Sequence, residues 1–204
     1  MLTPFLEEHG FFCVGLERLT IMQKWIIIPK NTPEIITCCS KCGSGSRFEC
    51  SNSFRINANG KALDVWLIYK CSACNTTLNI EILSRVKHSQ IGKALYSAFV
   101  ENDIDTARYY AFDSATMKRN KVVVGYENVG YDIEKSEHDG DAGRLEIVMD
   151  LKLPIRLDKL LGEGFGLSRS TVQCMLEGME ISCAEQEVSA NMKVKRGLVL
   201  RVNL

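Results

Sequence analysis

The stretches CSKCG, at residues 39–43, and CSACN, at residues 71–75, each contain two cysteines separated by two residues. Twenty-eight residues lie between the second cysteine of the first pair and the first cysteine of the second pair. A two-residue spacing lets both thiolates of a tight turn point at one ion, and four thiolates around one ion leave no open position for water. We therefore expect one structural Zn2+ ion, not a catalytic one. The expected ligands are Cys39, Cys42, Cys71 and Cys74.

Other interpretations of the cysteines remain open at this point. Cys38 would replace Cys39 with a three-residue spacing, although the spacing from Cys39 matches that of the second pair. Reduced buried thiols are the alternative to a metal site. A redox role is disfavoured, because neither pair opens a helix after a buried strand, where a reactive thiolate is stabilised. The unpaired cysteines are interpreted as small apolar fillers or free thiols: Cys13, Cys50, Cys174 and Cys183.

The residues between the two pairs have the pattern of β-strands. Residues 47–49, 53–57 and 62–69 contain many aromatic and β-branched side chains, and the Asn59-Gly60 dipeptide between the last two runs is a strong hairpin signal. A hairpin that returns the second cysteine pair beside the first is the layout of a zinc ribbon.

The composition is that of a globular protein, with 204 residues, 46% apolar and 25% charged. Nine cysteines favour either a disulfide framework or an intracellular protein with metal-bound and free thiols. Glu7 and Glu8 stand where a secretory signal would be basic, and no apolar stretch approaches the roughly 20 residues needed to span a bilayer. We expect a cytoplasmic protein with no membrane partner, and we interpret residues 1–21 as an extension before a natural start at Met22.

The formal net charge is zero, but the charges are unevenly distributed. Residues 29–90 carry eight Lys/Arg against four Asp/Glu, residues 151–204 carry eight against six, and residues 91–150 carry seven against twelve. The two basic segments suit an anionic partner, although exposed lysines that only solubilise a surface give the same count. Candidate contacts on the ribbon are Lys41, Arg47, Arg55 and Lys61.

The middle of the chain, residues 91–150, predicts short helices followed by strands. Apolar residues recur at helical spacing near its start, and Asp103 and Asp113 are candidate caps for two further helices. The acidic stretch 134–141 carries Asp-Gly turn chemistry, so we interpret it as a solvated hairpin tip and not as a metal or acid–base cluster. The expected helices, which should pack on the ribbon, cover 91–99, 104–112 and 114–119, and the expected strands cover 122–126 and 145–149.

From residue 151 the pattern predicts helix, helix, strand, strand. The glycine-rich run 162–166 ends the first helix, and Ser168 can cap the second, which Gly178 ends. The glycine run is not a phosphate-binding loop, because it follows a helix and lacks the Lys-Ser/Thr of such loops. The expected strands are 179–183 and 198–202.

This C-terminal part resembles the alpha-L RNA-binding motif that is shared by the fourth small-subunit ribosomal protein, pseudouridine synthases and tyrosyl-tRNA synthetases. The matching residues are Arg156-Leu157-Asp158-Lys159-Leu160-Leu161, Leu167-Ser168-Arg169-Ser170, Gly178, Ile181 and Lys193-Val194-Lys195-x-Gly197. In that family, basic side chains on the two helices and the turn contact phosphates of structured RNA, which gives little readout of base identity. The resemblance implies that the RNA contacts are Arg156, Lys159, Arg169, Lys193, Lys195 and Arg196.

The chain departs from the motif at several positions. Ser182-Cys183-Ala184 replaces the usual Val-Asn-Gly, and Leu198 replaces the usual acid after the turn glycine. The second helix lacks most of the lysine and arginine side chains that are usual there, and has instead Thr171, Gln173, Cys174 and Glu177. The resemblance therefore implies the fold more strongly than the RNA-binding function.

Taken whole after Met22, the chain also resembles an uncharacterised bacterial family, domain of unknown function 1062, which implies no activity. The resemblance depends on the first cysteine pair, on the run from Phe54 to Gly60, on Leu63 to Cys71, and on the helical segment that ends Tyr110-Ala111-Phe112-Asp113.

We thus expect an α+β protein in which a zinc ribbon with short helices precedes a small alpha-L-like module. The expected segments are an extension (1–21), the ribbon and helices (22–120), a β connector (121–150) and the RNA-binding module (151–204).

The expected function is a small non-catalytic zinc protein that binds structured RNA, either ribosomal or transfer RNA. The alternative is a protein-interaction or regulatory module that kept the fold and not the RNA. An enzyme acting on RNA or nucleotides is the weaker alternative, because the sequence shows no spaced acid–base pair and no open metal position.

Overall fold

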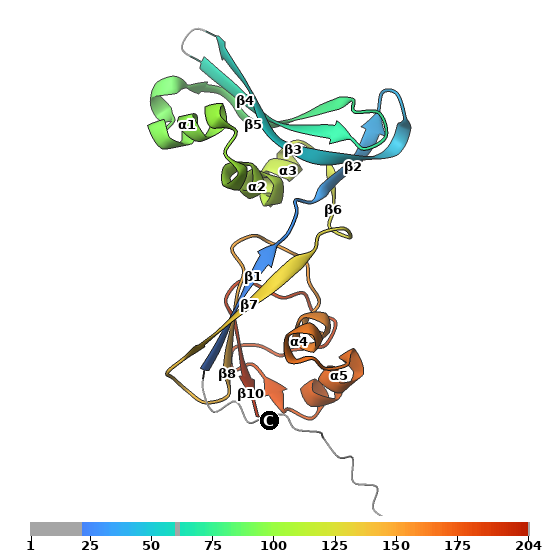
Figure 1. Ribbon diagram of the computed structural model, residues 1–204, viewed down its shortest axis with the longest axis vertical. Helices are drawn as coiled ribbons and strands as arrows, with labels where there is room; N and C mark the ends of the chain where they lie inside the picture. The colour runs from blue at the N-terminus through green and yellow to red at the C-terminus, as the bar shows by residue number, and fades with distance from the viewer. Residues whose placement is uncertain (1–21, 60–61, 204) are drawn as a thin grey trace, which may run out of the picture.

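The computed structural model describes residues 22–59 and 62–203 and has the expected α+β composition, with two sheets and five α-helices among these residues. Figure 1 shows two lobes joined by a narrow waist. We call residues 34–125 the cysteine lobe, and residues 22–29 with 131–203 the terminal lobe. Residues 30–33 and 126–130, which connect them, form the neck. The expected extension, residues 1–21, lies outside the described residues.

The cysteine lobe is built on an antiparallel sheet in the order β5-β4-β3-β2-β6. The predicted hairpin is confirmed: β3 and β4 pair from Phe48 and Cys71 to Asn59 and Ala62, while the turn at Gly60 lies outside the described residues. Every second residue of β4 is buried, because one face of the sheet is covered by helices. The strands are β2 (Glu34–Cys39), β3 (Gly43–Asn59), β4 (Ala62–Cys71), β5 (Thr77–Lys87) and β6 (Val123–Gly125).

Three short helices cover one face of this sheet, as expected. Asp103 accepts a hydrogen bond from the backbone N–H of Thr106, and Asp113 accepts from those of Ala115 and Thr116, so both predicted caps are confirmed. Buried Phe99 anchors the first helix on the sheet. The helices are α1 (Lys93–Glu101), α2 (Ile104–Phe112) and α3 (Ser114–Arg119), preceded by a 3-10 turn η1 (His88–Gln90).

The terminal lobe contains a mixed sheet in the order β7-β1-β8-β10-β9, in which β1 runs parallel to β8 and the other pairs are antiparallel. The amphipathic helix α4 buries its leucines against this sheet, and α5 packs on α4. The elements are β1 (Met22–Pro29), β7 (Tyr131–His138), β8 (Arg144–Val148), α4 (Leu157–Phe165), α5 (Arg169–Glu177), β9 (Ile181–Ser182) and β10 (Leu198–Val202).

The lobes differ from the segments expected from the sequence. Residues 22–29 were expected to belong with the ribbon, yet β1 pairs with β7 and β8 of the terminal lobe. The physical reason is that Trp25 and Ile27, both buried, pack in the core formed by α4 and the terminal sheet. The cysteine lobe is therefore inserted between β1 and β7.

The acidic stretch 134–141 also differs from its expectation as a hairpin tip. Residues 134–138 form the second half of β7 and pair with β1, which lies between β7 and β8. His138 accepts or donates a hydrogen bond with Ser136, and this stretch contributes to no group of metal-binding side chains among the described residues.

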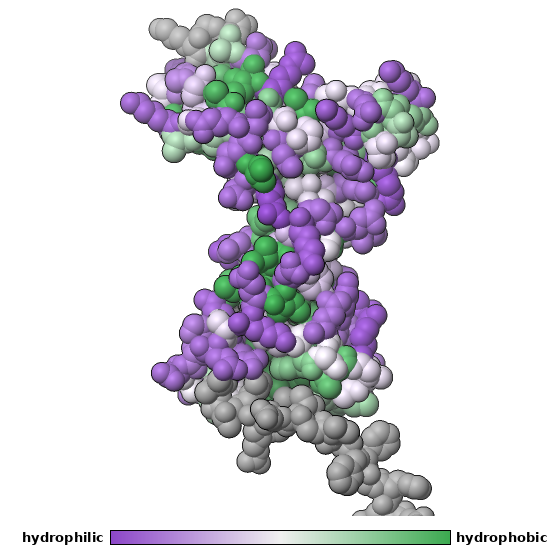
Figure 2. Space-filling model, viewed as in Figure 1, coloured by the Kyte–Doolittle hydropathy of each residue, from purple (hydrophilic) through white to green (hydrophobic). Residues whose placement is uncertain are grey.

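The neck holds the two lobes together through short antiparallel contacts. The backbone N–H of Lys30 donates to the Gly130 carbonyl, and the Asn31 side chain bonds the backbone of Asn128 and Gly130. Phe112, at the end of α2, belongs to the hydrophobic core of the terminal lobe. Figure 2 shows that hydrophilic residues cover much of this waist on the face in view. None of the described helices has the length and apolar character needed to cross a bilayer.

Candidate metal centre and basic pocket

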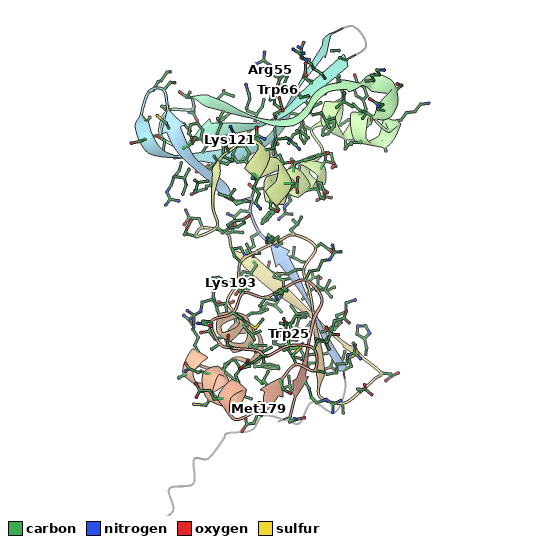
Figure 3. All side chains as sticks on the ribbon, turned by 180° about the vertical axis from the view of Figure 1, so that it is seen from behind. Trp25, Arg55, Trp66, Lys121, Met179 and Lys193 are labelled. Carbon is green, nitrogen blue, oxygen red and sulfur yellow. The ribbon has the colours of Figure 1, made fainter. Side chains whose placement is uncertain are left out.

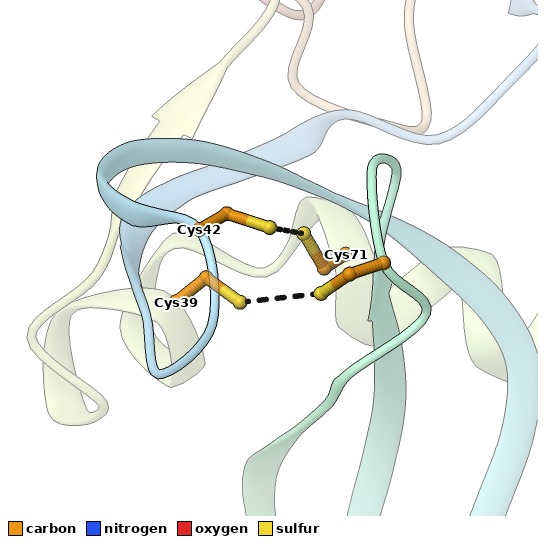
Figure 4. A group of neighbouring side chains, drawn as sticks. Cys39, Cys42 and Cys71 are labelled. Carbon is orange, nitrogen blue, oxygen red and sulfur yellow. Dashed lines mark hydrogen bonds between the residues drawn. The ribbon is translucent and has the colours of Figure 1, made fainter.

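The four predicted cysteines meet at one end of the cysteine sheet. The first pair lies at the connection between β2 and β3, and the second lies between β4 and β5 (Figure 4). The four sulfur atoms all lie within 4.8 Å of one another. The Cys39 and Cys74 sulfurs are 3.5 Å apart, and those of Cys42 and Cys71 are 4.0 Å apart. Zn–S bonds of about 2.3 Å in a tetrahedron require sulfurs about 3.8 Å apart. The spacing therefore suits one metal ion.

Local backbone geometry positions these thiols. Gly43 and Asn75, which follow the two pairs, have φ of +88° and +58°, a region that glycine and asparagine adopt at low cost. The second turn is closed by hydrogen bonds from the Asn75 N–H to the Cys71 carbonyl and from the Cys71 N–H to the Thr76 carbonyl. Both turns are therefore fixed by the ends of paired strands.

The electrostatics of the cluster favour a bound cation. The backbone N–H groups of Lys41 and Cys42 lower the pKa of Cys39, and hydrogen bonds from the side chain and backbone of Thr76 lower the pKa of Cys74 to about 6. The neighbouring Cys74 thiol raises the pKa of Cys42 to about 12, with burial adding to the effect. The hydrogen bonds to Cys39 and Cys74 favour the thiolate forms of these two residues, whereas full ionisation of the cluster needs a positive charge at its centre.

The structure separates Cys38 from this cluster. Cys38 is exposed and its sulfur lies 3.8 Å from the carbonyl oxygen of Cys39, whereas Cys39 is buried. The described cysteines outside the cluster are free thiols: Cys38, Cys50, Cys174 and Cys183. Cys13 lies outside the described residues. The four-cysteine group is the only such cluster among the described residues.

The basic residues expected on the ribbon are distributed over its surface. Arg47 pairs with Glu34 at 2.6 Å, and the Arg55 guanidinium lies 5.8 Å from the centre of the Trp66 ring (Figure 3). Lys41 is exposed, and Lys61 lies outside the described residues.

In the terminal lobe, Asp158 connects two of the six residues expected to contact RNA. Its carboxylate accepts two hydrogen bonds from Arg156, of 3.0 and 2.8 Å, and two from Arg169, of 3.1 and 2.9 Å. The hydrogen bond from Arg156 is the largest of the effects that lower the pKa of Asp158, and the bond from Arg169 adds to it. Together they bring this pKa to about 2, although burial of the carboxylate acts to raise it. Asp158 is buried, while the Arg156 and Arg169 side chains are 42% and 55% exposed. The carboxylate therefore holds two guanidinium groups at the surface.

Three of the six predicted residues line one pocket of about 320 Å3, which we call the basic pocket. Arg156 and Lys193 approach each other through an isolated β-bridge, and the Lys159 ammonium lies 5.3 Å from the centre of the Tyr131 ring. Lys193 lies in the part of the terminal lobe nearer the cysteine lobe (Figure 3). The remaining lining residues are Tyr126, Glu127, Val129, Leu153, Pro154 and Ile155.

The last two predicted residues lie outside the basic pocket. Lys195 donates a hydrogen bond to Gln186, and Arg196 lies 3.5 Å from Asp150 in an exposed ion pair. Sequence reasoning missed the contributions of Asp158 and Tyr131. The Arg156-x-Asp158 spacing was a signal for the first, because a carboxylate at the start of a helix attracts neighbouring guanidinium groups. No local feature of the sequence marks Tyr131, because only the tertiary fold brings β7 to the pocket.

Comparison with known proteins identifies the family. A family model described as "Protein of unknown function (DUF1062)" matches residues 56–187, which is more than half of the chain. The chain belongs to this family. The DUF1062 match includes Cys71 and Cys74, together with Arg156, Lys159 and Arg169; it begins after the first cysteine pair and ends before Lys193. Neither a curated protein nor a solved structure matches the chain.

Proposed function

We propose that this protein is a non-catalytic zinc protein that binds structured RNA, ribosomal or transfer RNA, through its terminal lobe. The observation that carries the proposal is the convergence of Arg156, Lys159 and Lys193 on the basic pocket. Three cations against one carboxylate, that of Glu127, give the hollow a positive balance that suits phosphate oxygens. Contacts to phosphates provide most of the affinity of many proteins for nucleic acids.

The arrangement of the arginines supports this proposal. The Asp158 carboxylate fixes Arg156 and Arg169 without covering them, so a phosphate would meet guanidinium groups that have already lost much of their rotational freedom. The element order α4, α5, β9, β10 agrees with the helix-helix-strand-strand order of the alpha-L motif.

The four cysteines support a structural role for the metal. All four positions of a tetrahedron are taken by sulfur, so a Zn2+ ion held there would have no site for water or substrate. The location of the cluster fits a zinc ribbon, because the ion would join the β2–β3 and β4–β5 turns at one end of the sheet.

Salt-dependent binding of a transfer RNA and of a structured ribosomal RNA fragment tests the proposal. About four phosphate contacts give a slope of log K against log salt of roughly −3 to −4, since each neutralised phosphate contributes just under one unit. The double variant Lys159→Gln/Lys193→Gln should weaken binding to every structured RNA and reduce the steepness by about two units. The matched control is Lys118→Gln, which alters an exposed lysine on α3. No binding at low salt, or equal loss in both proteins, would contradict the proposal.

A protein-interaction module is the second candidate, and the surface of α5 favours it. Gln173 donates a hydrogen bond to Glu177 there, and the helix interior carries no lysine or arginine after Arg169. Such a face offers little to a phosphate and more to a polar protein surface. Absence of any nucleic-acid binding at low salt would leave this candidate.

A further inference from the structure

A second pocket, of about 430 Å3, lies where the neck meets the cysteine lobe, and we call it the neck pocket. Its volume is in the range of small-molecule sites, about 300–1,000 Å3. Four parts of the chain contribute to it: the neck, the start of β2, the bulged part of β3, and α2. The lining residues are Lys30, Asn31, Thr32, Glu34, Glu49, Cys50, Asn52, Ile104 and Arg108.

An irregularity in β3 shapes this pocket. The register between β3 and β4 shifts between Cys50 and Ser53, so two residues of β3 bulge out of the ladder. Asn52, in the bulge, has φ of +53°, a left-handed conformation that asparagine adopts more readily than most residues. Its Oδ1 atom is buried and has no hydrogen-bond partner among the described residues. A buried polar atom without a protein partner calls for an explanation, and a polar group of a ligand is one.

A second unmet polar group lies behind the pocket. The Tyr69 side chain is fully buried, and its hydroxyl has no hydrogen-bond partner among the described residues. The Cys50 thiol, which lines the pocket, is close enough to interact with this hydroxyl and with that of Thr32.

The charges of the pocket are of both signs. Arg108 donates one hydrogen bond to the Pro29 carbonyl, which holds its guanidinium at the neck and leaves further N–H groups for a ligand. Lys30 and Glu34 form ion pairs with other residues, whereas Glu49 has no ion-pair partner among the described residues. The free groups are thus an anion and an amide oxygen on β3, and a guanidinium on α2.

We propose that the neck pocket binds a small zwitterion of the α-amino acid class. Its ammonium group would donate to the Glu49 carboxylate and, once the Asn52 side chain turns toward the pocket, to the Asn52 Oδ1 atom. Its carboxylate would accept from Arg108. Ile104 supplies an apolar contact for the side chain of the ligand. This site is independent of the basic pocket, so it stands whether or not the protein binds RNA.

Calorimetric titration of the metal-loaded full chain with each of the twenty L-amino acids tests this site. At least one should bind saturably, and its N-acetyl and amide derivatives, which each lack one charge, should bind at least about tenfold more weakly. Absence of saturable binding to all twenty at millimolar concentration would overturn the proposal, as would equal binding of either derivative.

Variants locate the bound amino acid. Asn52→Gly removes the orphan oxygen and keeps a residue that tolerates positive φ, and Arg108→Gln removes the guanidinium. Each should weaken binding at least about tenfold, while Lys118→Gln, outside the pocket, should not. Thermal melting checks that each variant is folded. Unchanged affinity in both folded pocket variants would overturn the site. If a pocket variant does not fold, the backbone amide chemical shifts of residues 30–32 and 34 in the unaltered protein decide the question. These shifts change on titration if the site is correct and stay the same if it is wrong.

Discussion

The two lobes hold their cores together in different ways. The terminal lobe surrounds a cluster of buried apolar residues that includes Trp25, Leu145, Ile147 and the leucines of α4. The core of the cysteine lobe is smaller and counts two of the clustered cysteines, Cys39 and Cys71, among its buried residues. The core of the terminal lobe is stabilised by apolar packing. The core of the cysteine lobe includes thiols whose close arrangement is favourable only around a cation. The comparison teaches that loss of metal should affect the two lobes unequally.

The largest effect should follow removal of the metal. Cys71→Ser, or strong chelation, should destabilise the cysteine lobe by more than about 4 kcal/mol, because a structural metal contributes much of the stability of the domain that binds it. Amide hydrogen exchange should then accelerate in β2 to β5 and stay slow in β8 and β10. Trp66 is a poor reporter of this change, since its side chain is already partly exposed.

Cys38→Ser is the matched control for this experiment. It alters an exposed cysteine one residue from the cluster, whose sulfur lies near the carbonyl oxygen of Cys39 and not among the four clustered sulfurs. Exchange rates should match those of the unaltered protein. Equal loosening of both lobes after metal removal would show that their cores do not differ in this way.

A substitution in the terminal lobe should destabilise that lobe and leave the cysteine lobe unchanged. A Cβ atom added at Gly164 would lie 2.0 Å from the Trp25 ring, so Gly164→Ala should destabilise the terminal lobe by about 3 kcal/mol, near the upper end for overpacking. Denaturant unfolding followed by Trp25 fluorescence measures this change, and metal content should be unaltered. Gly130→Ala, where the nearest atom is 3.5 Å away, is the control with an ordinary contact. A stability of Gly164→Ala equal to that of Gly130→Ala would refute the packing described for Trp25.

A smaller effect should depend on pH. The folded-state pKa of Asp158 is depressed to about 2, so its stabilising effect is present above the unfolded pKa near 3.9 and is lost as pH falls through 4 toward 2. Because both guanidinium partners are half exposed, we expect about 1 kcal/mol. Asp158→Asn should remove this contribution to the pH dependence in denaturant unfolding of the terminal lobe. An unchanged pH profile in that variant would contradict the assigned bonds.

The smallest effect is expected at the buried phenol of the cysteine lobe. Tyr69→Phe removes a hydroxyl that has no partner among the described residues, so in the absence of ligand the free energy of unfolding should stay the same or rise by up to about 1 kcal/mol. Chemical denaturation with zinc in excess measures this change. A loss of more than about 1 kcal/mol would mean that the hydroxyl is paired.

Local signals in the sequence predicted much of the cysteine lobe. The aspartates at 103 and 113 located two helix starts, because a capping carboxylate acts on the N–H groups two and three residues later. The cysteine spacing predicted which sulfurs meet. Cys39 was preferred to Cys38 because its spacing matches that of the second pair. Strand alternation gives a second reason, since residues two apart on a strand share a face and Cys39 shares that of buried Ile35.

Long-range relations could not be predicted in the same way. The sequence around Trp25 indicates a strand but not its partners, and those partners begin more than 100 residues later. The neck pocket depends on a bulge at Asn52 and on the approach of Arg108 to β1, and neither has a local signature. The convergence of Arg156, Lys159 and Lys193 required the fold as well, although each residue was named from the motif.

Metal analysis of the native protein, combined with X-ray absorption at the zinc edge, tests the central claim most directly. One zinc ion per chain, surrounded by four sulfur atoms at about 2.3 Å, is the predicted result. A folded cysteine lobe that contains no metal, or a zinc ion with nitrogen or oxygen ligands in place of sulfur, would contradict it.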